Sequence, residues 1–131
     1  MVGEEAAASF SPWTDAEPLR SLTPVMRGAD RLRCSLVPSL LEARRTNEAL
    51  ANPRIELFEI ARVYLPRGKK LPDEQPMLGL TSGRDFRAVK GVIEGMVAAL
   101  NPAARLVAAD SQSDLFDPGA SCRLLLDGEL L

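Results

Sequence analysis

The sequence predicts an α+β fold in which helices flank a mostly antiparallel sheet. Two segments, residues 36–50 and 86–100, carry apolar residues at helical spacing. Runs rich in β-branched and aromatic residues lie between and after them, bounded by proline, glycine and aspartate. Asp127-Gly128 is a strong hairpin signal near the end of the chain. Helices interleaved with antiparallel strands pack as layers, which is the α+β arrangement.

The first thirty residues predict little regular structure. The alanines of residues 4–13 favour helix, but Ser11-Pro12 after Phe10 is equally typical of an edge strand, and we interpret this stretch as a strand. Residues 14–30 are dense in Pro, Gly, Asp and Ser, so we expect an irregular connection with a short strand near Leu22. Residues 1–20 are therefore the poorly defined part of the chain.

The first helix is predicted from Leu36 to Leu50. Ser35 is placed to cap it, and Pro38 falls in the first turn, where proline is tolerated. Asn52-Pro53 ends the helix, because a residue before proline is disfavoured in the helical conformation.

Residues 55–64 predict a central strand covered on both sides, because apolar side chains fall on both alternating faces. Residues 66–73 predict a long exposed turn, and residues 77–81 then return as an antiparallel neighbour. Together they form a strand–loop–strand unit.

The second helix, residues 86–100, carries the clearest apolar stripe and ends at Asn101-Pro102. Gly91 and Gly95 each cost about 1 kcal/mol in a helix relative to alanine, so we expect a close approach to another element there. Residues 106–109 and 121–126 predict strands, and residues 129–131 begin a return strand. Since the sequence stops within that strand, we expect a piece excised from a longer chain.

Length, net charge and composition exclude several classes of protein. A chain of 131 residues fits one domain, residues 1–131, and its net charge of −2 argues against a free-standing nucleic-acid binder. No apolar run approaches the roughly 20 residues that a membrane span needs. The start lacks the basic-then-apolar order of a secretion signal, so we expect a cytoplasmic protein with no membrane partner.

The absence of histidine excludes the common nucleophile pairs and histidine-ligated metal sites. Cys34 and Cys122 stand far apart in apolar settings, and we expect two buried free thiols. Asp110, Asp114 and Asp117 are irregularly spaced, which favours solvated loop acids over metal ligands. The sequence thus predicts no catalytic, cofactor-binding or metal-binding residue.

Three segments, in order, resemble one family. They are LRCSLVPSLLE at 32–42, LFEIARVYLPRG at 57–68, and LGL at 78–80 followed by GRDF at 83–86 and VKGVIE at 89–94. These are similar to the L-R-T-S-L-L-P-G-L-L, L-F-E-I-G-R-V-F and D-(F/L)-K-G-x-(V/I)-E segments of the bacterial-type phenylalanyl-tRNA synthetase β subunit. LFDPGAS at 115–121 and LDG at 126–128 resemble the family's F-x-H-P-G-R-S-A turn and L-D-G hairpin. The resemblance covers about residues 22–131.

Five positions depart from that pattern. Cys34, Ser39 and Ala61 replace other small residues. Asp117 and Ala120 stand where the family has histidine and arginine, so any partner contact normally made by that turn is in doubt.

The resemblance implies a non-catalytic module similar to the class II aminoacyl-tRNA synthetase core. The family's catalytic subunit binds ATP through arginine, whereas Leu65 and Pro66 follow Arg62-Val63-Tyr64 here, and no glycine-rich phosphate-binding run occurs. The resemblance thus implies that the isolated chain is inactive and has no cofactor. It further implies an (αβ)2 phenylalanine–tRNA ligase in which the chain assembles with the catalytic α subunit, and which charges tRNA using ATP and magnesium.

Within this framework, two groups of charged residues are candidates for contacts. Arg33, Arg45, Glu59 and Arg62 are candidates for a subunit interface or a structural ion pair, in which Glu59 pairs with Arg33 or Arg62. The alternatives are a solvated or catalytic Glu59 and a solvated face around Arg45.

The second group is Arg67, Lys69 and Lys70, the only compact basic cluster. It is a candidate for tRNA or partner contact, and the alternative is an exposed turn with no partner.

Two other hypotheses stay open. An independent enzyme with Cys34 as nucleophile requires a depressed thiol pKa. An independent interaction or RNA-binding domain without catalysis is disfavoured by the acidic balance and the few aromatic side chains available for stacking.

Overall fold

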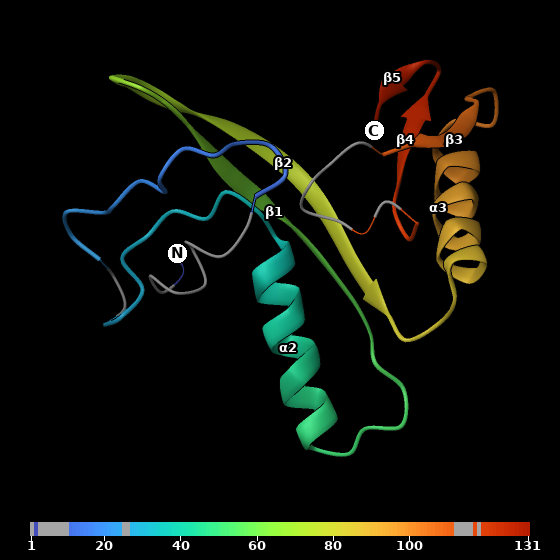
Figure 1. Cartoon of the computed structure of the whole chain (residues 1–131), viewed down its shortest axis with the longest axis horizontal. Coiled ribbons are helices and arrows are strands. Elements are labelled where there is room, and N and C mark those ends of the chain that lie inside the picture. The colour runs from blue at the N-terminus through green and yellow to red at the C-terminus, as the bar shows by residue number, and fades with distance from the viewer. Residues whose placement is uncertain (1, 3–10, 25–26, 112–116, 118) are drawn as a thin grey trace. The chain divides into compact units, whose positions relative to one another are not determined.

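The computed structural model describes residues 2, 11–24, 27–111, 117 and 119–131. The chain is divided into two compact units, residues 1–83 and 84–131, and the elements of each are labelled in Figure 1. Each unit combines one helix with antiparallel strands, so the predicted α+β class is confirmed. A single domain stays a prediction. Most of the N-terminal edge strand expected in residues 4–13 lies outside the described residues.

The first unit contains helix α2 (Val37–Ala49) and strands β1 (Glu56–Arg67) and β2 (Lys70–Ser82). The predicted helix is confirmed to within one residue at each end. The N-cap residue is Leu36, which makes no side-chain cap bond, and not Ser35 as predicted. The Ser35 hydroxyl accepts a hydrogen bond from the Val37 backbone N–H at 3.1 Å, and Pro38 occupies the first turn. The strand predicted near Leu22 is wrong, because the backbone bends there and the side chain is 98% exposed.

Strands β1 and β2 pair as one long antiparallel hairpin, from Glu56 opposite Ser82 to Arg67 opposite Lys70. The long turn predicted for residues 66–73 is wrong. Only Gly68 and Lys69 form the turn, and the φ of +63° at Gly68 suits a residue without a side chain. Residues 70–73 are strand despite Pro72, since each strand of a two-stranded ladder has one unpartnered edge where a missing N–H breaks no ladder bond.

Helix α2 and the segment before it cover one face of the hairpin. Leu36, Leu40 and Val63 are buried together, and the apolar side chains packed around them are those of Leu57, Ala61, Leu65 and Met77. Gly79 allows this close approach, because a Cβ built on it would lie 2.7 Å from Leu40 Cδ1. Packing of Leu40 against β2 therefore requires a residue without a side chain at position 79.

The opposite face of the hairpin is apolar and exposed. Phe58 and Ile60 are 73% and 71% exposed, and their cross-strand partners are Leu80 and Leu78. The prediction that residues 55–64 are covered on both sides is therefore wrong for the described part of the chain. Alternation of apolar residues identifies two apolar faces, but it does not specify which element covers each of them.

The second unit contains helix α3 (Phe86–Leu100) and strands β3 (Leu106–Asp110), β4 (Cys122–Leu126) and β5 (Glu129–Leu130), in the sheet order β3-β4-β5. Asp85 caps α3 by accepting from the Ala88 N–H at 2.8 Å. Asp127 and Gly128 both have positive φ, as a type I′ turn requires, so the predicted hairpin is confirmed.

The close approach predicted at the two glycines of α3 is not found. Apart from the neighbouring residues and the backbone of α3 itself, no atom of the described residues lies within 4 Å of a Cβ built on Gly91 or Gly95, so the expected close approach is not formed there. Neither described helix combines the length and apolar character that a membrane crossing requires.

Candidate functional site

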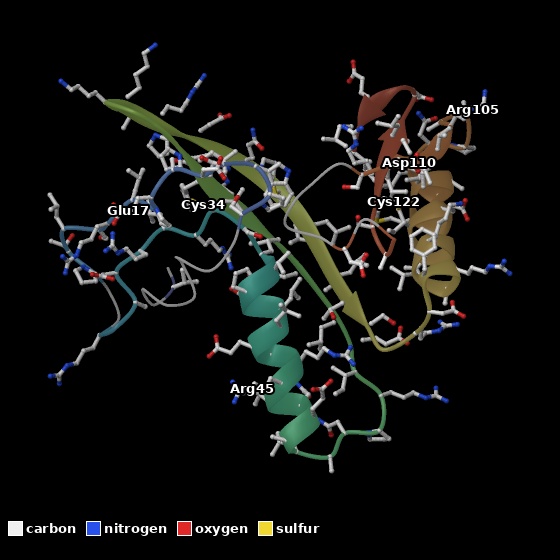
Figure 2. The ribbon with its side chains drawn as sticks, in the orientation of Figure 1. Glu17, Cys34, Arg45, Arg105, Asp110 and Cys122 are labelled. Atoms are coloured by element: carbon white, nitrogen blue, oxygen red, sulfur yellow. The ribbon has the colours of Figure 1, made fainter. Side chains whose placement is uncertain are left out.

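The segment that leads into α2 runs along β1. The Tyr64 N–H donates to the Arg33 carbonyl oxygen at 2.9 Å, and Cys34 Sγ donates to the Tyr64 carbonyl oxygen at 3.3 Å. The Ser11 hydroxyl donates to the Cys34 carbonyl oxygen at 3.1 Å. Cys34, labelled in Figure 2, is buried with Ser35. These bonds fix where the side chain of Arg33 lies relative to the strand.

Arg33 and Glu59 form the best-enclosed ion pair of the described residues in this unit. Arg33 Nη1 lies 2.6 Å from Glu59 Oε1, and the two side chains are 20% and 30% exposed. Arg33 Nε also donates to the Arg62 carbonyl oxygen at 3.2 Å. Glu59 is opposite Gly79 in the hairpin register, so no cross-strand side chain competes for the space. A charge-assisted pair held by a further bond to the backbone has one defined geometry.

Arg62 and Arg45 do not join that pair. Arg62 Nη1 lies 2.9 Å from Glu74 Oε2 across the hairpin, and both side chains are largely exposed. Arg45 projects from α2 (Figure 2) and makes no ion pair with another described residue. The structure thus selects Arg33 over Arg62 as the partner of Glu59. A role of these four residues at a subunit interface stays a prediction.

The basic cluster occupies the tip of the hairpin. Arg67 and Lys70 face each other as the last register pair, and Lys69 lies in the turn between them. All three residues are exposed, and none forms an ion pair with a residue that the structure describes. Residues 60–72 contain four Arg or Lys and no Asp or Glu, while Asp73 and Glu74 lie opposite Leu65 and Tyr64, so the positive charge is concentrated at the tip itself.

The thiol of Cys34 is not activated. Burial raises the pKa of Cys34 above its ordinary value, which keeps the thiol protonated at neutral pH. This shift is opposite to the one that a nucleophilic Cys34 requires. Both cysteines are free as expected, but Cys122 is only half-buried.

The acidic residues singled out in the sequence are only partly described by the structure, because Asp114 lies outside the described residues. Among the residues that the structure describes, no three side chains of metal-ligating type gather at one place. Asp117 shapes a turn instead, because its Oδ1 accepts from the Gly119 N–H at 2.8 Å. Asp110, labelled in Figure 2, uses its backbone oxygen to accept from Arg123 Nε at 3.1 Å.

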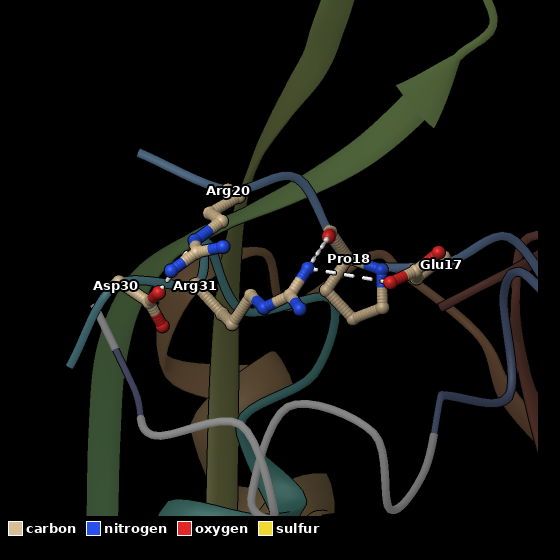
Figure 3. Close-up of polar contacts among 5 residues, drawn as sticks. All are labelled: Glu17, Pro18, Arg20, Asp30 and Arg31. Atoms are coloured by element: carbon tan, nitrogen blue, oxygen red, sulfur yellow. Dashed lines mark hydrogen bonds and ion pairs between the residues drawn. The ribbon is translucent and has the colours of Figure 1, made fainter. Parts of the chain in front are cut away.

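Sequence reasoning missed the polar contacts that hold the connection before α2. Arg20 Nε lies 2.7 Å from Asp30 Oδ2, and Arg31 Nη1 lies 3.3 Å from both Glu17 Oε1 and the Pro18 carbonyl oxygen. Figure 3 draws these five residues. An isolated bridge also pairs Arg20 with Arg31. Pairs separated by ten or more residues in an irregular segment leave no periodic signal in the sequence.

Comparison with known proteins assigns the family. A family model described as the phenylalanyl tRNA synthetase beta chain CLM domain matches residues 1–131. The chain belongs to this family. A phenylalanine–tRNA ligase beta subunit from Rhodopirellula baltica is 40% identical over 98% of this chain and 20% of the relative. The corresponding subunit from Bacillus cereus is 32% identical over 87% of this chain and 16% of the relative.

Membership of the CLM family confirms the resemblance seen in the sequence. The segment at 32–42 leads into α2, the segment at 57–68 forms most of β1 and the hairpin tip, and the segment at 83–94 begins α3. The chain spans about a fifth or less of the length of these relatives.

Proposed function

We propose that this chain is a non-catalytic module of a phenylalanine–tRNA ligase β subunit and supports assembly with the catalytic α subunit. Membership of the CLM family is the observation that carries the proposal, and the relatives are named as beta subunits. In the proposed (αβ)2 enzyme, a class II catalytic core in the α subunit uses ATP and magnesium to charge tRNA with phenylalanine in the cytoplasm. This module contributes structure and contact surface.

The residues at the expected nucleotide-binding position support a non-catalytic role. Leu65 packs against the buried cluster of Leu36, Leu40 and Val63, and Pro66 follows it in β1. Stabilising the charge of a phosphoryl group requires arginine, lysine, backbone N–H groups or a metal ion. Neither of these side chains supplies one, and the buried Cys34 thiol stays protonated.

The exposed apolar face of the hairpin supports the assembly role. Phe58 and Ile60, with Leu78 and Leu80 opposite them, form an apolar centre, and the exposed pair of Arg62 and Glu74 lies beside it. An apolar centre with charged groups at its rim is the usual composition of a protein–protein interface. We assign the α subunit as the occupant of this face, because the relatives are named as beta subunits of a phenylalanine–tRNA ligase.

The proposal is tested by co-purification and by activity. The tagged chain is mixed with the α subunit of the same organism, and the eluate is assayed for phenylalanine-dependent exchange of pyrophosphate into ATP. We expect the α subunit to be retained by the chain and the chain alone to give no exchange. Exchange by the chain alone, or failure of the full-length β subunit to retain the α subunit, contradicts the proposal.

A further inference from the structure

We propose that the tip of the hairpin, formed by Arg67, Lys69 and Lys70, binds the phosphate backbone of double-stranded RNA, and that tRNA is the RNA it contacts. The choice of tRNA rests on the function proposed above. The choice of an RNA backbone rests on the charge and shape of the tip.

The charge of the tip differs from that of the whole chain. Residues 60–72 carry four positive side chains and no acid, although the chain as a whole has a net charge of −2. Asp73, the nearest acid along β2, hydrogen bonds to Gln75 within its own strand. Since the three tip cations have no ion-pair partner among the described residues, binding an anion there breaks no existing salt bridge.

The position of the tip makes these cations accessible. The buried cluster reaches only as far as Leu65 in β1 and Met77 in β2, and the strands continue beyond Leu65 to the turn. Three further residues at about 3.4 Å each place the turn about 10 Å beyond that point. This distance exceeds the Debye length of about 8 Å at physiological salt, so acids of the unit that lie further from the turn than Asp73 are largely screened from the tip.

The composition of the tip favours a duplex backbone over single-stranded RNA. Single strands are bound by stacking bases on aromatic side chains, and Tyr64 is the only aromatic residue between 61 and 73. Double-stranded RNA is bound through its shape and its phosphates, which needs only closely spaced cations on a narrow element. Arg67 and Lys70 lie opposite each other across a two-residue turn, which provides that arrangement.

Strand addition by a protein partner is less suited to this end of the hairpin. Pro66, Pro72 and Pro76 lie in the strands at or near the tip, and proline offers no N–H to an added strand. The prolines therefore favour recognition of the tip through its side chains. The exposed cations are the side chains that the tip presents.

Fluorescence anisotropy of labelled tRNA transcript tests the inference over 50–200 mM salt at about 25 °C. For three phosphate contacts, the affinity of the unaltered chain should fall roughly 20- to 40-fold over that fourfold range of salt. The triple variant Arg67→Glu, Lys69→Glu and Lys70→Glu should bind at least tenfold more weakly at 50 mM salt, with a salt slope smaller by about 2 to 3. The conservative variant Arg67→Lys should retain binding.

A matched control has the same net charge as the triple variant but changes exposed arginines elsewhere: Arg27→Glu, Arg54→Glu and Arg87→Glu. We expect this control to lose less than threefold in affinity. Equal losses in the two triple variants overturn the inference, as does equally tight binding of the chain to poly-glutamate or to anionic phosphatidylserine vesicles. Retention of the α subunit by the tip variant separates this result from the proposed assembly function.

Discussion

The two faces of the β1–β2 hairpin are formed by alternating residues of the same two strands and have opposite surroundings. On one face Val63 is completely buried beneath Leu36 and Leu40, whereas on the other Phe58 and Ile60 remain exposed. Both sets of side chains are equally apolar, so composition does not distinguish them. The difference shows that one face has its cover within the unit and the other is available to a partner.

The largest expected contrast compares truncations on the two faces. Leu40→Ala should lower the free energy of unfolding by about 2–5 kcal/mol, because it leaves a cavity against Val63. Ile60→Ala should change the free energy of unfolding by less than about 0.5 kcal/mol, since its side chain is exposed. Urea denaturation of both variants measures the contrast. Equal losses show that the two faces are equally covered.

Substitution of Gly79 in β2 tests how tightly the covered face of the hairpin is packed. Gly79→Ala should destabilise the chain by about 1–3 kcal/mol, because the added Cβ overlaps Leu40 Cδ1 at 2.7 Å. Gly95→Ala is the control, with no described atom within 4 Å of the added Cβ, and it should stabilise α3 by about 0.5–1 kcal/mol. Thermal unfolding of the two variants should give shifts of opposite sign. Stabilisation by Gly79→Ala contradicts the close contact at Gly79.

The ion pairs of the two faces should also differ. A double-mutant cycle on Arg33→Met and Glu59→Gln should give a coupling energy of about 1–2 kcal/mol, because the pair is mostly enclosed. The same cycle on Arg62→Met and Glu74→Gln, on the exposed face, should give about 0–1 kcal/mol. Coupling energies that are equal, or larger for the exposed pair, contradict the geometry described for Arg33.

The smallest expected effect is on reactivity. Cys34 should be alkylated by iodoacetamide at least tenfold more slowly than the half-buried Cys122, because Cys34 is buried and its thiol pKa is raised. The rate at Cys34 should increase only as the pH rises toward that elevated pKa. Mass spectrometry of the two cysteine-containing peptides measures both rates in one sample. Faster labelling of Cys34 at neutral pH revives the nucleophile hypothesis.

Local sequence signals predicted the positions of the helices and of the last hairpin well. They predicted the extent of β1 and β2 and the cover of their faces poorly. Helical spacing and flanking prolines gave α2 and α3, and Asp127-Gly128 gave the last hairpin, because capping and turn preferences act over a few residues. The length of β1 and β2 was missed because Pro66 and Pro72 indicate a turn in sequence yet are accommodated in a two-stranded ladder.

For the candidate site, the sequence placed Glu59 on the same strand face as other inward residues and suggested an arginine such as Arg33 or Arg62 as its partner. Arg62 lies three residues along β1 and therefore on the opposite face, and no local signal selects Arg33. That choice depends on the hydrogen bonds by which residues 33–34 lie along β1. The contacts of Arg20 and Arg31 join positions of an irregular segment, for which the sequence contains no local signal.

The most direct test of the central claim is isothermal titration of the α subunit with the chain carrying Ile60→Glu. Leu22→Glu provides the matched control, since Leu22 is an exposed leucine outside the hairpin. We predict that the unaltered chain and the Leu22 variant bind the α subunit with the same affinity, and that the Ile60 variant binds at least tenfold more weakly. Equal affinities for all three chains contradict the assignment of the exposed hairpin face to the α subunit.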